Sequence, residues 1–368
     1  MTLTRVIISG GGTGGHIFPA IAIAEALRAQ NPGIDILFVG ANGKMEMEKV
    51  PQAGFSIKGL NIAGFNRKNL LKNATLPFKI MTSMSSAFSI VRSFHPQLVI
   101  GVGGYASGPT LQVANWLKIP TLIQEQNSFP GKTNMLLAKK AKAICVAYPQ
   151  MERFFPKDVI HLTGNPVRKD LIHGVPNKKD GYVFYNLDAS KKTIFIMGGS
   201  LGAGSINSAV VNALDDLRRQ EGIQILWQCG KGYYEEYNTL DLPSHIKLLP
   251  FIERMDLAYA VADVIISRAG ATSISELTLV GKPCVLVPSP NVTEDHQTKN
   301  ALALSSRDAA ILVPEDNKVK DLLWSNIYSL LDDDSKAASL AQAIKKLALP
   351  NATADIVRIC NQLINHDN

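Results

Sequence analysis

A glycine-rich segment close to the amino terminus carries the first side chains that could do chemistry. Residues 9–19 read Ser-Gly-Gly-Gly-Thr-Gly-Gly-His-Ile-Phe-Pro. The β-branched run at 6–8 predicts a buried strand before them, and the alanine, isoleucine and leucine spacing of 19–30 predicts a helix after them. The glycines therefore lie in a strand-to-helix turn. There a backbone without Cβ atoms can approach a ligand, and N–H groups at the helix start can receive negative charge.

His16 follows these glycines directly and is expected at the mouth of the predicted helix. A histidine in that place can take a proton from an incoming hydroxyl, because a helix amino terminus disfavours the charged imidazolium. The alternative is a polar capping side chain that only shapes the loop.

A second loop of the same kind occupies residues 198–204, which read Gly-Gly-Ser-Leu-Gly-Ala-Gly. It lies between a predicted strand at 193–197 and a helix that starts near Ile206. Two such loops predict two sheets. A ligand held between their carboxyl edges would lie in a cleft between two domains.

A third candidate is the segment 265–276, which reads as a buried strand, a turn of small residues and a helix start. Ala271, Thr272 and Ser273 offer backbone and hydroxyl donors to a pyrophosphate, and Glu276 could accept two ribose hydroxyls. The alternative is a capping arrangement with Glu276 as a solvated first-turn acid. Gln297 follows another strand and loop at the same predicted edge and could bind sugar hydroxyls.

The spacing of Gly10, Gly12 and Gly15 also satisfies G-x-G-x-x-G, the fingerprint of dinucleotide-binding enzymes. That function needs an acidic residue at the carboxyl end of the second strand, to hold the ribose hydroxyls. The corresponding position lies near Gly40, whereas Asp35 starts the strand. The sequence therefore disfavours a dehydrogenase.

Length and composition predict a two-domain globular enzyme. The chain has 368 residues, of which 46% are hydrophobic and 19% charged. A net charge of +7 indicates an anionic partner, which could be nucleic acid, an acidic membrane surface or a phosphorylated substrate. The four cysteines lack metal-ligand spacing, and we expect them to be buried and reduced, in the cytoplasm. We expect neither a signal peptide nor a membrane span.

Alternating strands and helices predict two doubly wound sheets. The expected strands lie at 6–8, 35–39, 98–101, 121–124, 143–146 and 159–162, and then at 193–197, 224–228, 246–249, 264–267, 284–287 and 310–313. Residues 40–65 are expected to be irregular and 174–188 to form a surface loop. The turn-rich stretch 163–168 is the predicted interdomain hinge. The helical tail after Pro350 is expected to pack on the first domain.

Residues 70–94 predict a helix that is both basic and apolar. Arg67, Lys68, Lys72 and Lys79 accompany its apolar residues. Such a helix fits the interface of an anionic membrane, and the alternative is a helix packed on the sheet with solvated lysines.

The order of these motifs resembles the MurG family of bacterial peptidoglycan N-acetylglucosaminyltransferases, within glycosyltransferase family 28. The resemblance covers nearly the whole chain and rests on residues 10–16, 101–109, 124–127, 164–168, 198–203, 268–276 and 295–297. It implies an α/β GT-B fold, with two Rossmann-like doubly wound domains facing a deep cleft. Residues 1–166, completed by 349–368, would face the acceptor and the membrane, and 167–348 would bind the UDP-sugar.

The resemblance also implies the reaction. N-acetylglucosamine would pass with inversion from UDP-N-acetylglucosamine to the 4-hydroxyl of the muramyl sugar of lipid I, giving lipid II and UDP in peptidoglycan biosynthesis. No covalent intermediate, essential metal or cofactor is expected. The rivals are a GT-B transferase of another glycolipid or secondary-metabolite acceptor, which residues 105–109 disfavour, and a non-catalytic nucleotide-binding adaptor, which His16, Glu125 and Glu276 disfavour.

Site residues follow from the resemblance, position by position. His16 is the first choice for the catalytic base, with Glu125 as the competitor. The implied donor-binding residues are Thr13, Gly14, Gly15, Asn127, Arg168, Ser200, Ile252, Ala271, Thr272, Ser273, Ile274, Ser275, Glu276 and Gln297. The implied location is the cytoplasmic face of the inner membrane, as a peripheral protein. Lipid I, the anionic membrane surface, and cell-wall and division proteins are the implied partners, and nucleic acid is not.

Overall fold

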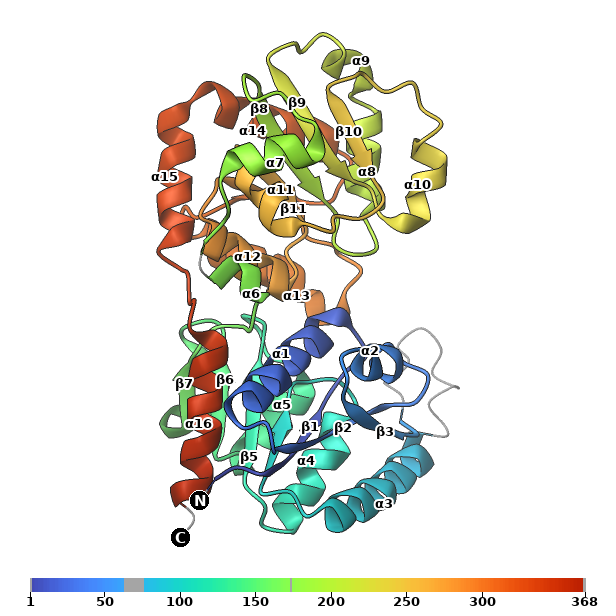
Figure 1. The fold of residues 1–368 in the computed structure, drawn as a ribbon, viewed down its shortest axis with the longest axis vertical. Helices are drawn as coiled ribbons and strands as arrows, with labels where there is room; N and C mark the ends of the chain where they lie inside the picture. Colours follow the sequence, from blue (N-terminus) through green and yellow to red (C-terminus); the bar gives the residue numbers. More distant parts are fainter. Residues whose placement is uncertain (1, 63–75, 173, 367–368) are drawn as a thin grey trace. The chain divides into compact units, whose positions relative to one another are not determined.

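The computed structural model describes residues 2–62, 76–172 and 174–366. It divides into two compact units, one made of Met1–Val167 with Asn351–Asn368, and the other of Arg168–Pro350. The chain therefore passes between the units twice, after Val167 and after Pro350 (Figure 1).

The first unit is built on a parallel sheet. Its described strands lie in the order β3-β2-β1-β4-β5-β6-β7. They are β1 Arg5–Ser9, β2 Asp35–Ala41, β3 Ser56–Leu60, β4 Leu98–Gly101, β5 Thr121–Glu125, β6 Ala143–Val146 and β7 Ile160–Leu162. Its α-helices are α1 Gly14–Gln30, α2 Glu46–Gln52, α3 Leu76–Phe94, α4 Ser107–Trp116, α5 Lys132–Leu137 and α16 Ala352–His366.

Helices cover both faces of this sheet because alternate residues of each strand point to opposite sides. Val6 and Ile8 of β1 belong to a core shared with α1 and α16. Ile7, between them, belongs to a second core shared with α3 and α4. The strands are therefore buried on both faces, as their continuous apolar runs predict.

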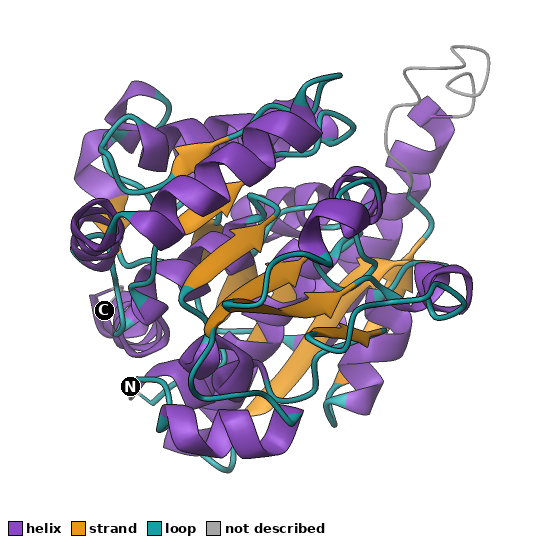
Figure 2. Cartoon of the chain, turned by 90° about the horizontal axis from the view of Figure 1, so that it is seen from above, coloured by secondary structure: helices purple, strands orange, loops and turns teal. Residues whose placement is uncertain are grey.

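The second unit has the same design. Its described strands lie in the order β10-β9-β8-β11-β12-β13, all parallel. Figure 2 shows strands of the chain with helices on either side of them. The strands are β8 Lys192–Met197, β9 Ile223–Gln228, β10 Ile246–Leu249, β11 Val264–Ser267, β12 Cys284–Leu286 and β13 Ile311–Leu312. The α-helices are α6 Lys169–Ile172, α7 Lys178–Tyr185, α8 Gly204–Val211, α9 Leu214–Leu217, α10 Lys231–Tyr237, α11 Met255–Val261, α12 Ala271–Val280, α13 His296–Ser305, α14 Val319–Asp332 and α15 Asp334–Lys345.

Two sequence predictions about loops are wrong. Residues 40–65 contain α2 and β3, and β3 pairs with β2 in register. Residues 174–188 contain α7, which begins where the Asn177 side chain accepts a hydrogen bond from the Lys179 N–H and ends at Asn186 in the left-handed conformation. Both helices are only about two turns long, so neither shows enough apolar periodicity to be recognised in the sequence.

The predicted helix 70–94 is present from Leu76 onward as α3. Arg67, Lys68 and Lys72 lie outside the described residues. The four cysteines are buried and free, as predicted. Across the described ranges, the structure contains no helix that is long and apolar enough to cross a bilayer.

Candidate active site

The glycine-rich loop of the first unit connects β1 to α1 at the carboxyl edge of the sheet. It is tied to both neighbouring strands, since Gly10 N–H donates to Val39 O at 3.2 Å and Gly11 N–H donates to Gly103 O at 3.1 Å. Thr13 is the extended N-cap of α1 and makes no side-chain capping bond. The first-turn N–H groups of Gly14 and Gly15 have no acceptor within the helix, as at any helix start, and can serve a ligand.

His16 is half-buried and hydrogen-bonded through Nδ1 to the carbonyl oxygen of Gly11, at 3.0 Å. A carbonyl only accepts, so Nδ1 carries the proton and Nε2 carries the lone pair. Nε2 lies next to Gly103, where a Cβ atom would approach it to 3.0 Å. A glycine at 103 therefore leaves room around the one ring nitrogen that can accept a proton.

Glu125 ends β5 at the same edge and is buried. Its carboxylate accepts from Asn127 N at 3.0 Å, Asn127 Nδ2 at 3.3 Å, Gly131 N at 3.1 Å and Asn134 Nδ2 at 2.8 Å. Burial raises the pKa of Glu125, and these donors act in the opposite direction. Because a carboxylate has about four lone-pair sites, Glu125 is engaged in holding the loop after β5 and the start of α5 in shape.

In the second unit, Glu276 lies on α12 with only 4% of its surface exposed. Arg168 Nε donates to Oε1 at 2.8 Å, and the hydroxyl of Tyr259 donates to Oε2 at 2.9 Å. Burial, and then the Glu276 carboxylate, raise the pKa of Tyr259 well above its ordinary value, so the hydroxyl stays a donor. The alternative interpretation of Glu276 as a solvated first-turn acid is wrong.

The start of α12 presents unused donors beside Glu276. The Thr272 hydroxyl oxygen is buried and has no hydrogen-bond partner within the described residues, whereas Ser275 Oγ donates to Ala271 O at 3.0 Å. The N–H groups of Ala271, Thr272 and Ser273 are those that a helix leaves without an internal acceptor. A buried hydroxyl without a partner is costly, which indicates a site that a polar ligand completes.

The other predicted donor residues of the second unit also lie beyond strand ends. Ser200 is exposed in the loop between β8 and α8, and Ile252 is buried after β10. Gln297 is in the first turn of α13, where its Oε1 accepts from Ser289 N at 2.9 Å. Ile274 is buried within α12.

Sequence reasoning missed two buried polar residues at these edges, Tyr259 and Glu46. Tyr259 lies in the apolar helix α11 and reads there as an ordinary core residue. Glu46 lies in the segment that was expected to be irregular, and its carboxylate accepts from Gly12 N at 2.8 Å. Nothing local in the sequence distinguishes either from a structural or surface side chain.

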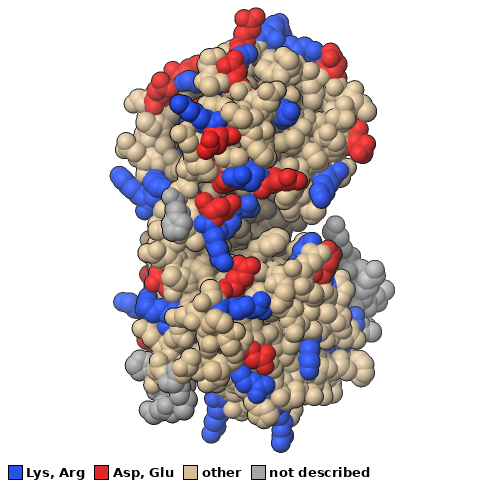
Figure 3. All heavy atoms as spheres, viewed as in Figure 1, with Lys and Arg blue, Asp and Glu red and all other residues tan. Residues whose placement is uncertain are grey.

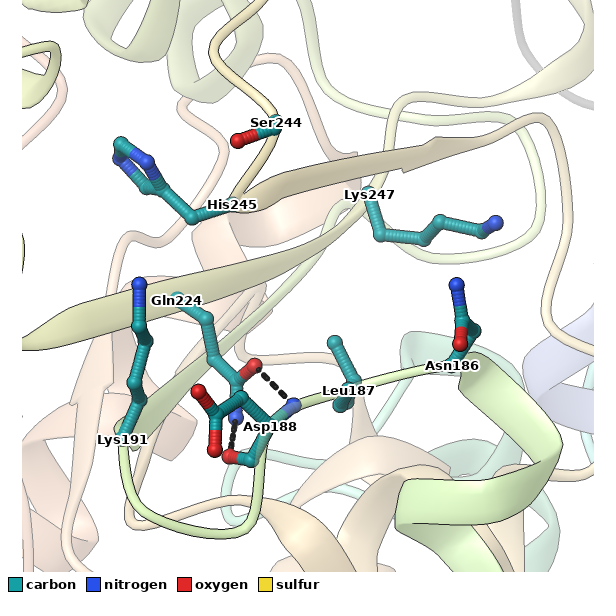
Figure 4. A pocket seen from close by; sticks show the side chains of 8 residues that line it. All are labelled: Asn186, Leu187, Asp188, Lys191, Gln224, Ser244, His245 and Lys247. Atoms are coloured by element: carbon teal, nitrogen blue, oxygen red, sulfur yellow. Dashed lines mark hydrogen bonds between the residues drawn. The ribbon is translucent and has the colours of Figure 1, made fainter.

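A pocket of about 200 Å³ lies elsewhere in the second unit (Figure 4). Its lining residues precede or begin β8, β9 and β10, so it opens at the amino edge of the sheet. They are Asn186, Leu187, Asp188, Lys191, Gln224, Ser244, His245 and Lys247. This pocket is separate from the candidate site at the carboxyl edge. Among the residues that the structure describes, no group of three or more His, Cys, Asp or Glu could hold a metal ion.

Two doubly wound units, each with a glycine-rich loop and a helix start at the carboxyl edge, define a GT-B glycosyltransferase. The crystal structure of MurG from Acinetobacter baumannii is similar, with a TM-score of 0.79 and 32% identity over 98% of this chain and 99% of that one. The glycosyltransferase of kitacinnamycin has a TM-score of 0.75 at 12% identity and so supports the fold alone. The predicted GT-B fold is confirmed.

Family models identify the group within this class. The N-terminal domain of glycosyltransferase family 28 matches residues 6–146, and the C-terminal domain matches residues 193–356. The chain belongs to glycosyltransferase family 28. The predicted family is thereby confirmed.

Curated relatives agree over nearly the full length. A protein of Flavobacterium psychrophilum is 55% identical over 96% of both chains, and one of Bacteroides thetaiotaomicron is 52% identical over 99% of both. Each is named UDP-N-acetylglucosamine–N-acetylmuramyl-(pentapeptide) pyrophosphoryl-undecaprenol N-acetylglucosamine transferase.

Proposed function

We propose that this chain transfers N-acetylglucosamine from UDP-N-acetylglucosamine to the muramyl sugar of lipid I, giving lipid II and UDP. The observation that carries the proposal is the identity of 50–55% over 96–99% of the chain with relatives named for that transfer. Two units with separate polar sites are the arrangement that a donor and an acceptor require.

The second unit binds the donor in this proposal. Glu276 accepts the ribose hydroxyls, and the Thr272 hydroxyl and first-turn N–H groups of α12 receive the pyrophosphate. Arg168, which already bonds Glu276 at 2.8 Å, adds positive charge beside it. As UDP leaves, these donors and Ser200 stabilise the charge that develops on its phosphate. Ile252 and Gln297 complete the proposed donor site of this unit. A contribution of Thr13, Gly14, Gly15 and Asn127 to donor binding stays a prediction.

His16 acts as the base. Its unprotonated Nε2 takes the proton of the muramyl 4-hydroxyl while that oxygen bonds to the anomeric carbon and the bond to UDP breaks on the opposite face. This single displacement inverts the anomeric carbon. The Nδ1 contact of His16, which leaves the lone pair on Nε2, and the four donors on Glu125 support His16 over Glu125 as the base.

The first unit meets the membrane through α3. Phe78 and Met81 are 69% and 70% exposed, and Trp116 of the neighbouring α4 is 58% exposed. Figure 3 shows mainly uncharged side chains over the part of the surface where α3 lies. Exposed apolar side chains on a helix that also carries Lys79 and Arg92 fit peripheral binding to an anionic bilayer, which we place at the cytoplasmic face of the inner membrane. Cell-wall and division proteins as partners stay a prediction.

Replacing Phe78 and Met81 together by serine should weaken binding to anionic vesicles by about tenfold or more, because two large apolar side chains no longer enter the interface. Sedimentation with phosphatidylglycerol vesicles measures this, and added salt should weaken the wild type further. Val183→Ser, which changes an 83% exposed side chain on α7 of the other unit, is the matched control. If the amount of bound protein depends neither on the anionic lipid content nor on the salt concentration, an anionic membrane surface is excluded as a partner.

The reaction itself is tested with purified protein, UDP-N-acetylglucosamine and a short-chain lipid I analogue in EDTA, following UDP and the disaccharide by mass. Disaccharide formed in the presence of EDTA would support the proposed donor and the proposed acceptor, and it would show that the transfer needs no metal ion. If UDP-N-acetylglucosamine binds but nothing is transferred, the acceptor assignment fails. Transfer to an unrelated glycolipid at an equal rate would favour a GT-B enzyme with another acceptor.

A further inference from the structure

Glu46 is a fully buried carboxylate beneath the glycine-rich loop of the first unit. Its Oε2 accepts from Gly12 N at 2.8 Å, and its Oε1 accepts from Ala41 N at 3.0 Å. One side chain at the start of α2 thus connects the β1–α1 loop to the end of β2. Backbone N–H bonds of this kind are strong, because the acceptor is charged.

The surrounding glycines make room for this carboxylate. A Cβ atom on Gly11 would lie 2.3 Å from the carboxyl carbon of Glu46, and a Cβ atom on Gly40 would lie 2.5 Å from its Cγ. Both distances are too short for any other residue at these positions to coexist with Glu46 without rearrangement. Glu46 therefore packs directly against the Gly11 peptide.

The Gly11 peptide is also held from the opposite side. Its N–H donates to Gly103 O at 3.1 Å, and a Cβ atom on Gly104 would lie 2.3 Å from the Gly11 oxygen. That same oxygen accepts the Nδ1 hydrogen of His16 at 3.0 Å. The carbonyl that selects the tautomer of His16 is thus clamped between Glu46 and the loop that contains Gly103 and Gly104.

We propose that Glu46 is a positioning residue, which holds the Gly11 carbonyl in place so that His16 keeps its proton on Nδ1 and presents Nε2 to the acceptor hydroxyl. This inference rests on the proposed function for its catalytic consequence. The placement of His16 itself can be measured without any substrate. A carboxylate is required because both N–H groups need an acceptor, whereas an amide at 46 has one acceptor oxygen.

Glu46→Gln should lower turnover by about 10- to 100-fold, the usual effect of removing a residue that orients a functional group. The Michaelis constant for UDP-N-acetylglucosamine should change by a smaller factor than turnover does, since the donor groups on α12 are untouched. In the free protein, the ¹⁵N signals of His16 should move from the pattern of a single Nδ1–H tautomer toward a mixture. A purely structural role of Glu46 would leave those signals unchanged in the folded variant.

Glu48→Gln is the matched control, because Glu48 lies in the same first turn of α2 but is exposed, and its described side-chain bonds go to Lys49 and Gln52 on its own helix. It should leave both turnover and the His16 signals unchanged. Thermal unfolding checks that Glu46→Gln folds. If Glu46→Gln does not fold, Glu46→Asp replaces it in the test. Aspartate keeps the charge but is too short to reach both N–H groups, so the loss of turnover and the shift of the His16 signals should be smaller but still present.

The outcomes separate the two proposals. Unchanged His16 signals and turnover in a folded Glu46 variant overturn the positioning role, whatever the reaction. A changed His16 tautomer in a protein whose wild type transfers no sugar supports the positioning role and overturns the proposed function. A turnover loss that Glu48→Gln shares equally would assign the effect to α2 as a whole and not to Glu46.

Discussion

The substitution His16→Ala should lower turnover by about 10² to 10⁴, while the affinity for UDP changes little, as expected when a general base is lost. The structure supports this split. The imidazole is hydrogen-bonded to the Gly11 carbonyl of the first unit. The Glu276 carboxylate lies on α12 of the second unit, as does the Thr272 hydroxyl, which has no partner among the residues that the structure describes. Single-turnover rates with the lipid I analogue, together with calorimetric binding of UDP, measure the two effects separately.

His16→Asn sharpens the result. An asparagine amide can still donate to the Gly11 carbonyl in place of Nδ1, but it has no counterpart of Nε2. If His16 is the base, the asparagine variant should be as slow as the alanine variant. If asparagine restores turnover to within about tenfold of the wild type, His16 shapes the loop and the base lies elsewhere.

Glu276→Ala should raise the Michaelis constant for the donor by about a hundredfold or more. Each hydrogen bond to a charged acceptor contributes about 1.5–3 kcal/mol, and the proposed ribose contact has two of them. The change also leaves Arg168 and the buried hydroxyl of Tyr259 without their bonds at 2.8 and 2.9 Å. Initial rates against UDP-N-acetylglucosamine at saturating acceptor measure the constant.

A ribose analogue shows whether the loss comes from the predicted contact. Wild-type protein should bind UDP far more tightly than 2′,3′-dideoxy-UDP, and Glu276→Ala should bind the two equally. Tyr259→Phe removes only the group that orients Oε2 and should weaken the donor by less than Glu276→Ala does. An undiminished preference for UDP in Glu276→Ala would place the ribose hydroxyls on another residue.

The polar side chains of the site show how far sequence reasoning reached. Residues 9–19, 198–204 and 265–276 were recognised as turns at strand ends, because short windows of glycine and β-branched residues encode them. Glu276 and Arg168 are both predicted as donor-binding residues, but the bond between them and the bond from Tyr259 to Glu276 are not predicted. Tyr259 lies 17 residues away and Arg168 lies 108 residues away. Such pairings arise only when distant strands and helices pack together.

Glu46 and Glu125 are two further carboxylates whose hydrogen-bond partners could not be predicted from the sequence. Glu46 stands in Lys-Met-Glu-Met-Glu-Lys, where an acidic residue reads as solvated, yet it is buried because Gly11 and Gly40 leave space for it. Glu125 was predicted as a competing base from its place at a strand end. In the structure, four N–H groups of Asn127, Gly131 and Asn134 donate hydrogen bonds to the Glu125 carboxylate, which gives it a structural role.

Local pattern was therefore sufficient for the two parallel sheets and the glycine turns, since each depends on residues close together in the chain. The order of several such short motifs along the chain was sufficient for the family. Folding assigned the polar partners. The Nδ1 proton of His16, the Arg168 and Tyr259 bonds of Glu276, and the burial of Glu46 depend on contacts among segments that only the packed units bring within hydrogen-bond distance. A buried polar group needs a hydrogen-bond partner, and that partner is set by which distant segments pack around it. A short stretch of sequence does not contain that information.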